Sequence, residues 1–355
     1  MNPKNIKVAY LFTSYRAEVA GKVAQGLDHG NGFWGMFKLP HFGIEATYLE
    51  PEQFYSKSVS QFIRRRLGVY WQHLSVFFAF FSYDFIFTST AYGTQLVFTL
   101  LHIRHPKWVM HDFSITGLIG NEKTLRQKAF AWMTSRAAGI VTLGVEEKDK
   151  LEKCFPHLKG KIEFIPFGVD LDFFKPMDIA QDGKIFAVGF DPDRDWKTLF
   201  EAVEGIDAPI VVATRPQRVV NLAVPSNVAI KQFTPRELAQ EYAKSLIIVV
   251  PLNTSKAIND AMGCSTLFEA MSSGKPVAAT NTHTMASYVA DGENGLLVPE
   301  GDTQALRAAI DKLLVDRELR ERLGKNARRY AEEYLDAEKL GEQLANFFKR
   351  LAAQR

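Results

Sequence analysis

Cysteine is scarce in this sequence. The 355 residues include only Cys154 and Cys264, which lie far apart along the chain. Two distant cysteines form neither a disulfide framework nor a metal-ligand cluster, and they favour a reducing compartment. The first strand-like run begins a few residues after Met1, which leaves no room for a signal peptide. We therefore expect a cytoplasmic protein.

Several other features are missing as well. No Gly-x-x-x-x-Gly-Lys-Ser/Thr phosphate loop occurs, which excludes the P-loop class of nucleotide hydrolases. No nucleic-acid-binding module is recognisable, and an isoelectric point of about 8.6 does not require a nucleic-acid partner. The hydrophobic content of 46% and the charged content of 23% are those of a globular protein. The length allows two domains with full cores.

The net positive charge of the chain lies in its first half. Residues 1–176 carry 21 Lys and Arg against 15 Asp and Glu, whereas the remainder carries 22 against 25. A basic half would suit an anionic substrate or an anionic membrane surface. Ordinary variation of surface residues is the alternative explanation.

Residues 61–85 combine a basic cluster with many aromatic side chains. The arginines Arg64–Arg66 are followed by Tyr70, Trp71 and several phenylalanines. Polar residues interrupt the apolar stretch, so it does not read as a transmembrane helix. The pattern is typical of an amphipathic helix that lies on a membrane surface. The alternative is a buried helix followed by a strand, with the arginines on a solvated face.

Apolar runs alternate with helical patterns through most of the chain. In the first half, the runs that read as strands are residues 6–12, 44–50, 83–89, 107–113, 139–144 and 161–167. In the second half they are residues 184–190, 209–214, 228–233, 246–252 and 276–281. Near-continuous apolar strands separated by helices predict parallel sheets covered on both faces. The fold class is therefore α/β, with two successive doubly wound domains.

A polar stretch at residues 168–184 separates the two halves and predicts the domain boundary. We expect an N-terminal domain over residues 1–173 and a C-terminal domain over residues 174–335. From Thr303 onward the pattern is almost wholly helical. We expect the last helix, residues 336–355, to cross back onto the first domain.

The clearest candidate for a ligand site follows the strand at residues 246–252. Open α/β sheets bind ligands beyond the carboxyl ends of their strands, and helix N-termini there attract anions. A helix beginning near Thr266 would offer free backbone N–H groups, together with the hydroxyls of Ser265 and Thr266, to a diphosphate. Alternatively, Thr266 and Glu269 form a capping box that only closes the helix end.

Four segments carry a more specific pattern. They are IPFGVDLDFFKP (165–176), GFDPDRDWKTLFEAV (189–203), TLFEAMSSGKPVAAT (266–280) and ADGENGLLVPEGD (290–302). In this order and at this spacing they resemble the family-four retaining glycosyltransferases, or glycosyl transferases group 1. The resemblance implies the GT-B architecture, with two Rossmann-like domains facing each other across a cleft. It also implies transfer of a sugar, with retention, from a nucleotide-diphosphate sugar to an acceptor hydroxyl.

In the C-terminal domain the resemblance implies that Glu269 holds the ribose hydroxyls of the donor. A carboxylate suits this role because it accepts hydrogen bonds from two adjacent hydroxyls. Arg194 and Lys197 would neutralise the diphosphate as negative charge builds on the leaving group. Alternatively, the two cations are solvated charges at a helix start. The donor-binding set is completed by Ser265, Thr266 and Leu267.

In the N-terminal domain the resemblance places His111 near the transferred sugar, at the end of a strand. Asp112 would orient it or bond a backbone group. The segment after the first strand would face the donor phosphates or the acceptor. Arg16 and Gly21 are therefore acceptor-side candidates, although the usual Gly-Gly pair is missing there.

Two positions depart from the family pattern. The first glutamate of the donor motif is replaced by Ala261, so Asn259, Asp260 or Lys256 would have to reach the sugar instead. Ser287 stands where the family often has Glu. Both changes concern sugar recognition and leave the identity of the donor open.

No metal and no cofactor are expected. The Asp-x-Asp patterns of residues 191–195 resemble the metal motif of another glycosyltransferase fold, but the surrounding organisation differs. The expected partners are a nucleotide sugar and an acceptor that is either a lipid-linked saccharide or a small molecule. An anionic membrane surface bound through residues 61–85 is a further expected partner. Two alternatives remain, a nucleotide-sugar epimerase of the same fold and a non-catalytic nucleotide-sugar-binding protein.

Overall fold

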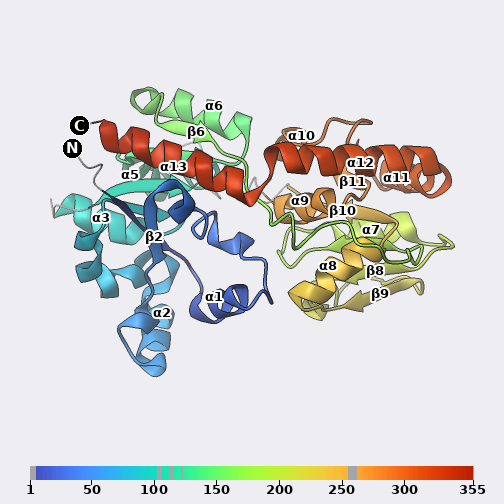
Figure 1. The fold of residues 1–355 in the computed structure, drawn as a ribbon, viewed down its shortest axis with the longest axis horizontal. Coiled ribbons are helices and arrows are strands. Elements are labelled where there is room, and N and C mark those ends of the chain that lie inside the picture. Colours follow the sequence, from blue (N-terminus) through green and yellow to red (C-terminus); the bar gives the residue numbers. More distant parts are fainter. Residues whose placement is uncertain (1–4, 102–105, 112–114, 121–122, 255–261, 355) are drawn as a thin grey trace. The chain divides into compact units, whose positions relative to one another are not determined.

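The computed structural model describes residues 5–101, 106–111, 115–120, 123–254 and 262–354. The chain divides into two compact units, and in each of them helices cover a sheet (Figure 1). Unit 1 comprises Met1–Gln25, Gly32–Pro166 and Glu338–Arg355, and unit 2 comprises Gly26–Asn31 and Phe167–Ala337. The change from unit 1 to unit 2 after Pro166 comes a few residues before the boundary expected at residue 173.

Unit 1 is built on a parallel sheet of six strands in the order β2-β1-β3-β4-β5-β6. The strands are β1 (Ile6–Leu11), β2 (Ile44–Tyr48), β3 (Phe85–Thr88), β4 (Lys107–His111), β5 (Gly139–Thr142) and β6 (Ile162–Phe164). β3 and β5 are buried along their whole length. Strands covered on both faces have no solvent side, so their sequences are continuous apolar runs.

The helices of unit 1 lie on both faces of this sheet. The α-helices are α1 (Ala17–Ala24), α2 (Lys57–Trp71), α3 (Tyr92–Leu100), α4 (Ile115–Ile119), α5 (Leu125–Thr134), α6 (Val145–Cys154) and α13 (Ala337–Ala353). The short 3-10 helices are η1 (Asn31–Phe33), η2 (Leu39–Phe42), η3 (Pro51–Gln53), η4 (Gln72–Ser82) and η5 (Pro156–Leu158).

The C-terminal helix α13 is part of the core of unit 1. Phe347 and Phe348 are buried there, and the ring of Phe348 lies 5.3 Å from that of Phe85. Gly139 of β5 makes this close packing possible, because a Cβ at that position would lie 2.7 Å from the ring of Phe347. Burying one Phe side chain stabilises a fold by roughly 1.5–3 kcal/mol. The last segment of the chain therefore holds the first domain together.

Unit 2 has a second parallel sheet of six strands in the order β12-β11-β10-β7-β8-β9. The strands are β7 (Ile185–Val188), β8 (Ile210–Ala213), β9 (Val228–Lys231), β10 (Ile247–Val250), β11 (Val277–Thr280) and β12 (Leu296–Val298). The helices are α7 (Trp196–Val203), η6 (Pro216–Arg218), α8 (Pro235–Lys244), α9 (Cys264–Ser272), α10 (His283–Ala286), α11 (Thr303–Val315) and α12 (Arg317–Tyr334).

The strand order of unit 2 reverses between β7 and β10. The chain leaves β7 toward β8 on one side, and it leaves β10 toward β11 on the other. Such a switch point opens a crevice at the carboxyl ends of the two strands, where α/β proteins bind ligands. The loop between β7 and α7 and the start of α9 both lie at this point.

The predicted α/β fold class is confirmed, although one strand was not predicted. β12 was not expected, because its three residues are too short to give an apolar run. Residues 61–85 form neither a single amphipathic helix nor a simple buried helix: α2 has a kink at Gly68 and continues as the 3-10 helix η4. Among the described residues, no helix has both the length and the apolarity needed to cross a bilayer.

Candidate nucleotide-binding site

Arg194 is the central residue of the switch point in unit 2. It lies in the loop between β7 and α7 and forms a backbone bridge with Leu252, just after β10. The side chain of Arg194 passes over Gly189. A Cβ built on Gly189 would lie 2.2 Å from the Nε of Arg194. Only glycine therefore leaves room for the side chain in this position.

The guanidinium of Arg194 is buried and only partly bonded. Its side chain is 4% exposed. Nε donates to Oδ2 of Asp191 at 2.9 Å, and Nη2 donates to Oγ1 of Thr266 at 3.0 Å. Nη1 has no hydrogen-bond partner within the part of the chain that the structure describes. A buried cation with an unsatisfied donor is costly, so an anion that accepted from Nη1 would be bound favourably.

Thr266 and Glu269 do not form the predicted capping box. Helix α9 begins earlier, at Cys264, after Gly263 with a positive φ of 78°, and the N-cap makes no side-chain hydrogen bond. A Cβ on Gly263 would also lie 3.0 Å from Val250, so the start of the helix is fixed by this glycine. Thr266 and Glu269 therefore lie inside the helix, and their side chains are engaged elsewhere.

Glu269 lies buried next to Tyr242 of helix α8. It is 6% exposed, and the hydroxyl of Tyr242 donates to its Oε2 at 2.9 Å. Burial raises the pKa of Glu269 to about 8, although the hydrogen bond from Tyr242 and the charge of Arg194 act in the opposite direction. The negative charge of Asp28 raises it further. Without a ligand, Glu269 is thus mostly protonated at neutral pH.

Asp28 belongs to the short segment Gly26–Asn31 that packs with unit 2. The guanidinium of Arg236 donates to the carbonyl oxygen of Gly26 at 2.7 and 3.0 Å. The backbone N–H of Asp170 donates to the side-chain oxygen of Asn31 at 3.0 Å. Local sequence gives no signal for Asp28 or Tyr242. Tyr242 reaches Glu269 from a different helix, and Asp28 acts on it electrostatically from a distant segment of the chain.

The other residues expected to bind the donor have different environments. Lys197 lies in the first turn of α7 with 73% of its side chain exposed, 3.7 Å from Glu201. Ser265 is exposed in the first turn of α9, whereas Leu267 is fully buried in the core. Asp195 caps α7 by accepting from the backbone N–H of Thr198 at 3.1 Å. Arg194, Thr266 and Glu269 are therefore the predicted residues that the fold brings together.

In unit 1, His111 is the last residue of β4 and is 4% exposed. Burial lowers its pKa well below the ordinary value, so the imidazole is neutral at pH 7. Its ring lies 3.8 Å from that of Trp34, measured between ring centroids. A neutral imidazole can donate from one nitrogen and accept at the other, which suits contact with hydroxyl groups.

The acceptor-side candidates lie on and before α1. The backbone N–H of Arg16 donates to Oε2 of Glu50 at 2.8 Å, and its guanidinium lies 4.7 Å from the ring centre of Phe12. Gly21 is exposed within α1, and nothing lies within 4 Å of a Cβ built there. Four further residues named from the sequence, Asp112, Lys256, Asn259 and Asp260, and the motif position Ala261 lie outside the described residues.

A metal site is not formed where the structure can be described. No group of three or more His, Cys, Asp or Glu side chains there has the geometry to hold a metal ion. In the Asp-x-Asp stretch, Asp191 bonds Arg194 and Asp195 caps α7. Both side chains thus stabilise the loop that carries Arg194.

Comparison with known proteins gives the family of this region. Residues 217–330 match the family model of "Glycosyl transferases group 1". The match covers 114 of the 355 residues. A D-inositol 3-phosphate glycosyltransferase from Streptomyces avermitilis is 27% identical over 221 residues, which cover 53% of this chain and 46% of that protein. The chain spans about half the length of the curated relatives it matches. The predicted resemblance to the glycosyl transferases group 1 is confirmed.

Solved structures show the same fold. Sucrose-phosphate synthase from Thermosynechococcus elongatus superposes with a TM-score of 0.73 at 19% identity, over 99% of this chain and 100% of that one. Anabaena HepE, solved in complex with UDP-glucose, superposes with a TM-score of 0.67 at 15% identity, over 97% and 100%. The GT-B fold expected from the sequence is therefore confirmed.

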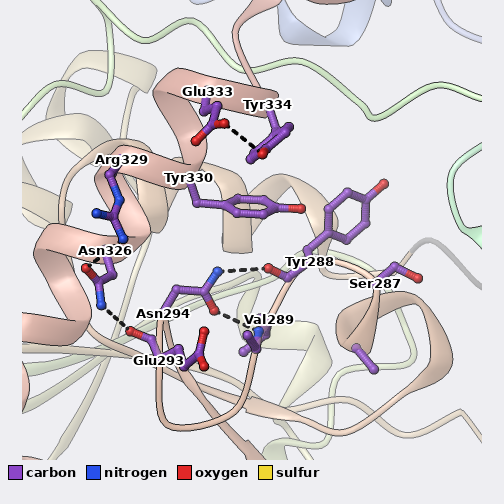
Figure 2. Close-up of a pocket in the computed structure, with 12 residues that line it drawn as sticks. Ser287, Tyr288, Val289, Glu293, Asn294, Asn326, Arg329, Tyr330, Glu333 and Tyr334 are labelled. Atoms are coloured by element: carbon purple, nitrogen blue, oxygen red, sulfur yellow. Dashed lines mark hydrogen bonds between the residues drawn. The ribbon is translucent and has the colours of Figure 1, made fainter.

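A separate cavity of about 380 Å³ lies in unit 2 between the end of α10 and helix α12, and Figure 2 shows its lining. Asn294 donates to the carbonyl oxygen of Tyr288 at 3.0 Å, and Asn326 donates to that of Glu293 at 2.8 Å. Ser287, which replaces a frequent family Glu, donates to the carbonyl oxygen of His283 at 3.1 Å. These side chains donate to backbone carbonyl oxygens nearby, so the buried Arg194 remains the stronger candidate for anion binding.

Proposed function

We propose that this chain is a retaining glycosyltransferase that moves a sugar, most simply a hexose, from a nucleoside-diphosphate sugar to an acceptor hydroxyl. The observation that carries the proposal is the buried guanidinium of Arg194. It lies at the switch point of unit 2, next to the first turn of α9, and its Nη1 is buried without a hydrogen-bond partner among the described residues. A group 1 segment and relatives named glycosyltransferases support the same activity.

The diphosphate is proposed to bind between Arg194 and the start of α9. The first turn of this helix offers backbone N–H groups and a positive dipole end to phosphate oxygens. Lys197, exposed on the first turn of α7, would add a second positive charge. In the transition state the leaving diphosphate gains negative charge, so these groups stabilise it more than they stabilise the ground state. On this proposal no metal ion is required.

Glu269 is proposed to accept hydrogen bonds from the two ribose hydroxyls of the nucleotide. Tyr242 would keep the carboxyl group in place through the bond to Oε2. The HepE structure was solved with UDP-glucose. UDP and its sugars are therefore the first donors to test on this chain, before GDP, ADP and TDP.

The chemical step is proposed to be a direct exchange at the anomeric carbon. The bond between this carbon and the phosphate oxygen breaks, and its electron pair stays with the diphosphate. The acceptor oxygen forms the new bond on the same face, and its proton passes to the leaving phosphate oxygen. This route needs no carboxylate as general base. The proposed role of His111, contact with the hydroxyls of the transferred sugar, rests on the family resemblance.

The acceptor and the location are also proposed. A lipid-linked or membrane-surface acceptor is supported by the surface of unit 1 described in the next subsection. A cytoplasmic location, at the inner face of the membrane, is supported by two cysteines that form no disulfide, of which Cys154 is exposed. Thiols that are exposed and unpaired are typical of a reducing compartment.

A thermal-shift panel of nucleoside diphosphates and their sugar conjugates tests the proposal. A ligand that binds only the folded state at a hundredfold excess over Kd stabilises it by about 2.7 kcal/mol. We expect one nucleotide to stabilise the wild type and an exposed control variant, Glu318→Gln, but to stabilise Glu269→Gln far less. No shift with any nucleotide would overturn the proposal.

Turnover with the selected donor then separates the transferase from its alternatives. Formation of a glycosylated acceptor whose anomeric configuration matches the donor, observed by NMR, is the expected result. Conversion of the donor without an acceptor would indicate an epimerase. Binding without turnover on any acceptor would indicate a nucleotide-sugar-binding protein.

A further inference from the structure

Many of the exposed apolar side chains of unit 1 lie in one segment, residues 54–81. Phe62 is 60% exposed, Phe81 55%, Phe78 48% and Phe77 45%. Trp71 at the end of α2 is 37% exposed. So many exposed aromatic side chains on one segment are uncommon on monomeric soluble proteins and mark a contact site for a membrane or a partner.

The exposed aromatic rings pack against one another and against Phe98, and they remain outside the core. The rings of Phe54 and Phe78 lie 5.0 Å apart, edge to face. Phe77 and Phe81 both rest against Phe98 of α3, at 6.4 and 6.3 Å. Their backbone is fixed as well, because the hydroxyl of Tyr55 donates to the carbonyl oxygen of Ser75 at 2.7 Å. The outward position of these rings is therefore built into the fold.

Of the three consecutive arginines, one is directed into the protein and two are exposed. Arg64 is directed inward, where it makes two hydrogen bonds of 2.7 Å to the carboxylate of Glu52. It also donates to the carbonyl oxygen of Thr13 at 3.0 Å. Arg65 and Arg66 are exposed, and the guanidinium of Arg66 lies 5.6 Å from the ring centre of Phe62. Positive charge thus borders the exposed aromatic side chains.

The charged side chains within residues 54–83 are all Lys or Arg. Between Phe54 and Tyr83 the sequence contains one Lys and three Arg, but no Asp and no Glu. Two of these arginines and Lys57 are exposed on α2, which lies at the edge of unit 1 away from α13 (Figure 1). Exposed Glu18 of α1 interacts electrostatically with Lys57, so the charge next to the aromatic rings comes chiefly from Arg65 and Arg66. A surface of aromatic rings with adjacent cations complements an anionic lipid interface.

We propose that unit 1 binds the surface of an anionic lipid bilayer through the exposed aromatic side chains between Phe54 and Phe81 together with Lys57, Arg65 and Arg66. The phenylalanines enter the boundary between headgroups and acyl chains, where aromatic rings are favoured. The cations remain at the level of the lipid phosphates. Binding is peripheral and reversible, and it is independent of nucleotide.

The position of this surface connects it with the proposed acceptor. Arg64 and Gln72 both bond the carbonyl oxygen of Thr13, the second residue after β1. Helix α2 is thereby tied to the carboxyl end of the first strand of unit 1. If the glycosyl transfer proposed above holds, an acceptor carried by a lipid would be presented beside the segment that begins at Thr13.

Vesicle co-sedimentation in the absence of nucleotide tests the inference. Vesicles of phosphatidylcholine alone are compared with vesicles that also contain phosphatidylglycerol. We expect the wild type to bind the anionic vesicles, more weakly at high salt. Removing two charges in Arg65→Gln/Arg66→Gln should weaken binding roughly 30-fold, since each basic residue near an anionic surface contributes about fivefold. Removing two rings in Phe62→Ser/Phe78→Ser should weaken it about tenfold or more.

Matched controls change the same properties elsewhere on unit 1. Lys123→Gln/Lys128→Gln removes two exposed charges from the start of α5, and Leu125→Ser removes a side chain that is 87% exposed. Both controls should bind vesicles as the wild type does. Equal loss in the controls and in the surface variants would overturn the inference.

Two other results would also overturn the inference. One is failure of the wild type to bind either kind of vesicle. The other is a dimer in analytical ultracentrifugation that dissociates in Phe62→Ser/Phe78→Ser, which would assign the aromatic surface to a second copy of the chain. Nucleotide binding, measured separately by thermal shift, would stay unchanged in all of these variants. Failure of this inference is thus distinguishable from failure of the proposed transferase activity.

Discussion

Replacing Glu269 by glutamine should change how the stability of unit 2 depends on pH. Glutamine keeps an oxygen that can accept the hydrogen bond from Tyr242, but it cannot ionise. In the wild type, burial raises the pKa of Glu269 from 4.5 to about 8. The variant therefore isolates the effect of placing a negative charge at this buried position.

The sign of the effect follows from proton binding. The folded state holds its proton on Glu269 up to about pH 8, whereas the unfolded state releases it near pH 4.5. Stability contributed by the protonated group is fully present below pH 4.5 and is lost as the pH rises through about 8. A pKa difference of this size corresponds to roughly 5 kcal/mol. Glu269→Gln lacks this loss, so it should become the more stable protein at alkaline pH.

Urea unfolding at pH 5, 7 and 9 measures this difference directly. The free energies of unfolding of wild type and variant should be similar at pH 5, and the variant should be several kcal/mol more stable at pH 9. Glu237→Gln on α8 is an informative control, because hydrogen bonds from Thr234 lower the pKa of Glu237 below 4.5. Its difference from the wild type should therefore stay constant between pH 5 and pH 9. A difference between wild type and Glu269→Gln that does not change with pH would refute the reasoning.

The affinity for the nucleotide should depend on the same ionisation of Glu269. With a pKa of about 8, roughly one tenth of Glu269 is ionised at pH 7. If only the carboxylate accepts from both ribose hydroxyls, the apparent Kd should fall about tenfold between pH 7 and pH 9. Titration calorimetry with the nucleoside alone avoids ionisation of the phosphates, and Glu269→Gln should show no such trend.

Four further outcomes are expected. Arg194→Met should lower kcat/KM at least tenfold more than Lys197→Met in steady-state assays, because Arg194 is buried and Lys197 is 73% exposed. Gly189→Ala should weaken nucleotide binding nearly as much as Arg194→Met does in calorimetry, because the new methyl group would displace the guanidinium. Burial keeps the pKa of His111 far below 6.5, so the pH–rate profile between pH 6 and 8 should be the same in wild type and His111→Asn, apart from its height. Phe347→Ala should destabilise unit 1 by about 3–5 kcal/mol in urea unfolding, because it leaves a cavity against β5.

The sequence predicted most of the fold because the strands are buried on both faces. Eleven apolar runs corresponded to β1 through β11, whereas the three residues of β12 gave no run of their own. The segment after β2 was harder to predict. Its apolar side chains do not show whether they face the core or the solvent, and the kink at Gly68 depends on a backbone conformation that glycine allows but does not require.

The candidate site was predicted in part. Arg194, Thr266 and Glu269 follow strand ends within recognisable motifs, so local sequence was enough to select them. The capping interpretation of Thr266 and Glu269 was wrong because Gly263 starts the helix earlier than the hydroxyl pattern suggested. Tyr242 and Asp28 could not be selected, since they come from a different helix and from a distant loop. Contacts of that kind are determined by the tertiary fold rather than by local pattern.

The central claim is that Arg194 binds the diphosphate of the donor. The most direct test is titration calorimetry of the nucleoside diphosphate selected by the thermal-shift panel, and of its nucleoside, with wild type and Arg194→Met. A charged hydrogen bond contributes about 1.5–3 kcal/mol, so the diphosphate should bind the wild type roughly 10- to 100-fold more tightly than the nucleoside. In Arg194→Met this advantage should largely disappear. The nucleoside itself should bind somewhat more weakly at neutral pH, because loss of the Arg194 charge raises the pKa of Glu269 further. An unchanged ratio of the two affinities in the variant would contradict the account.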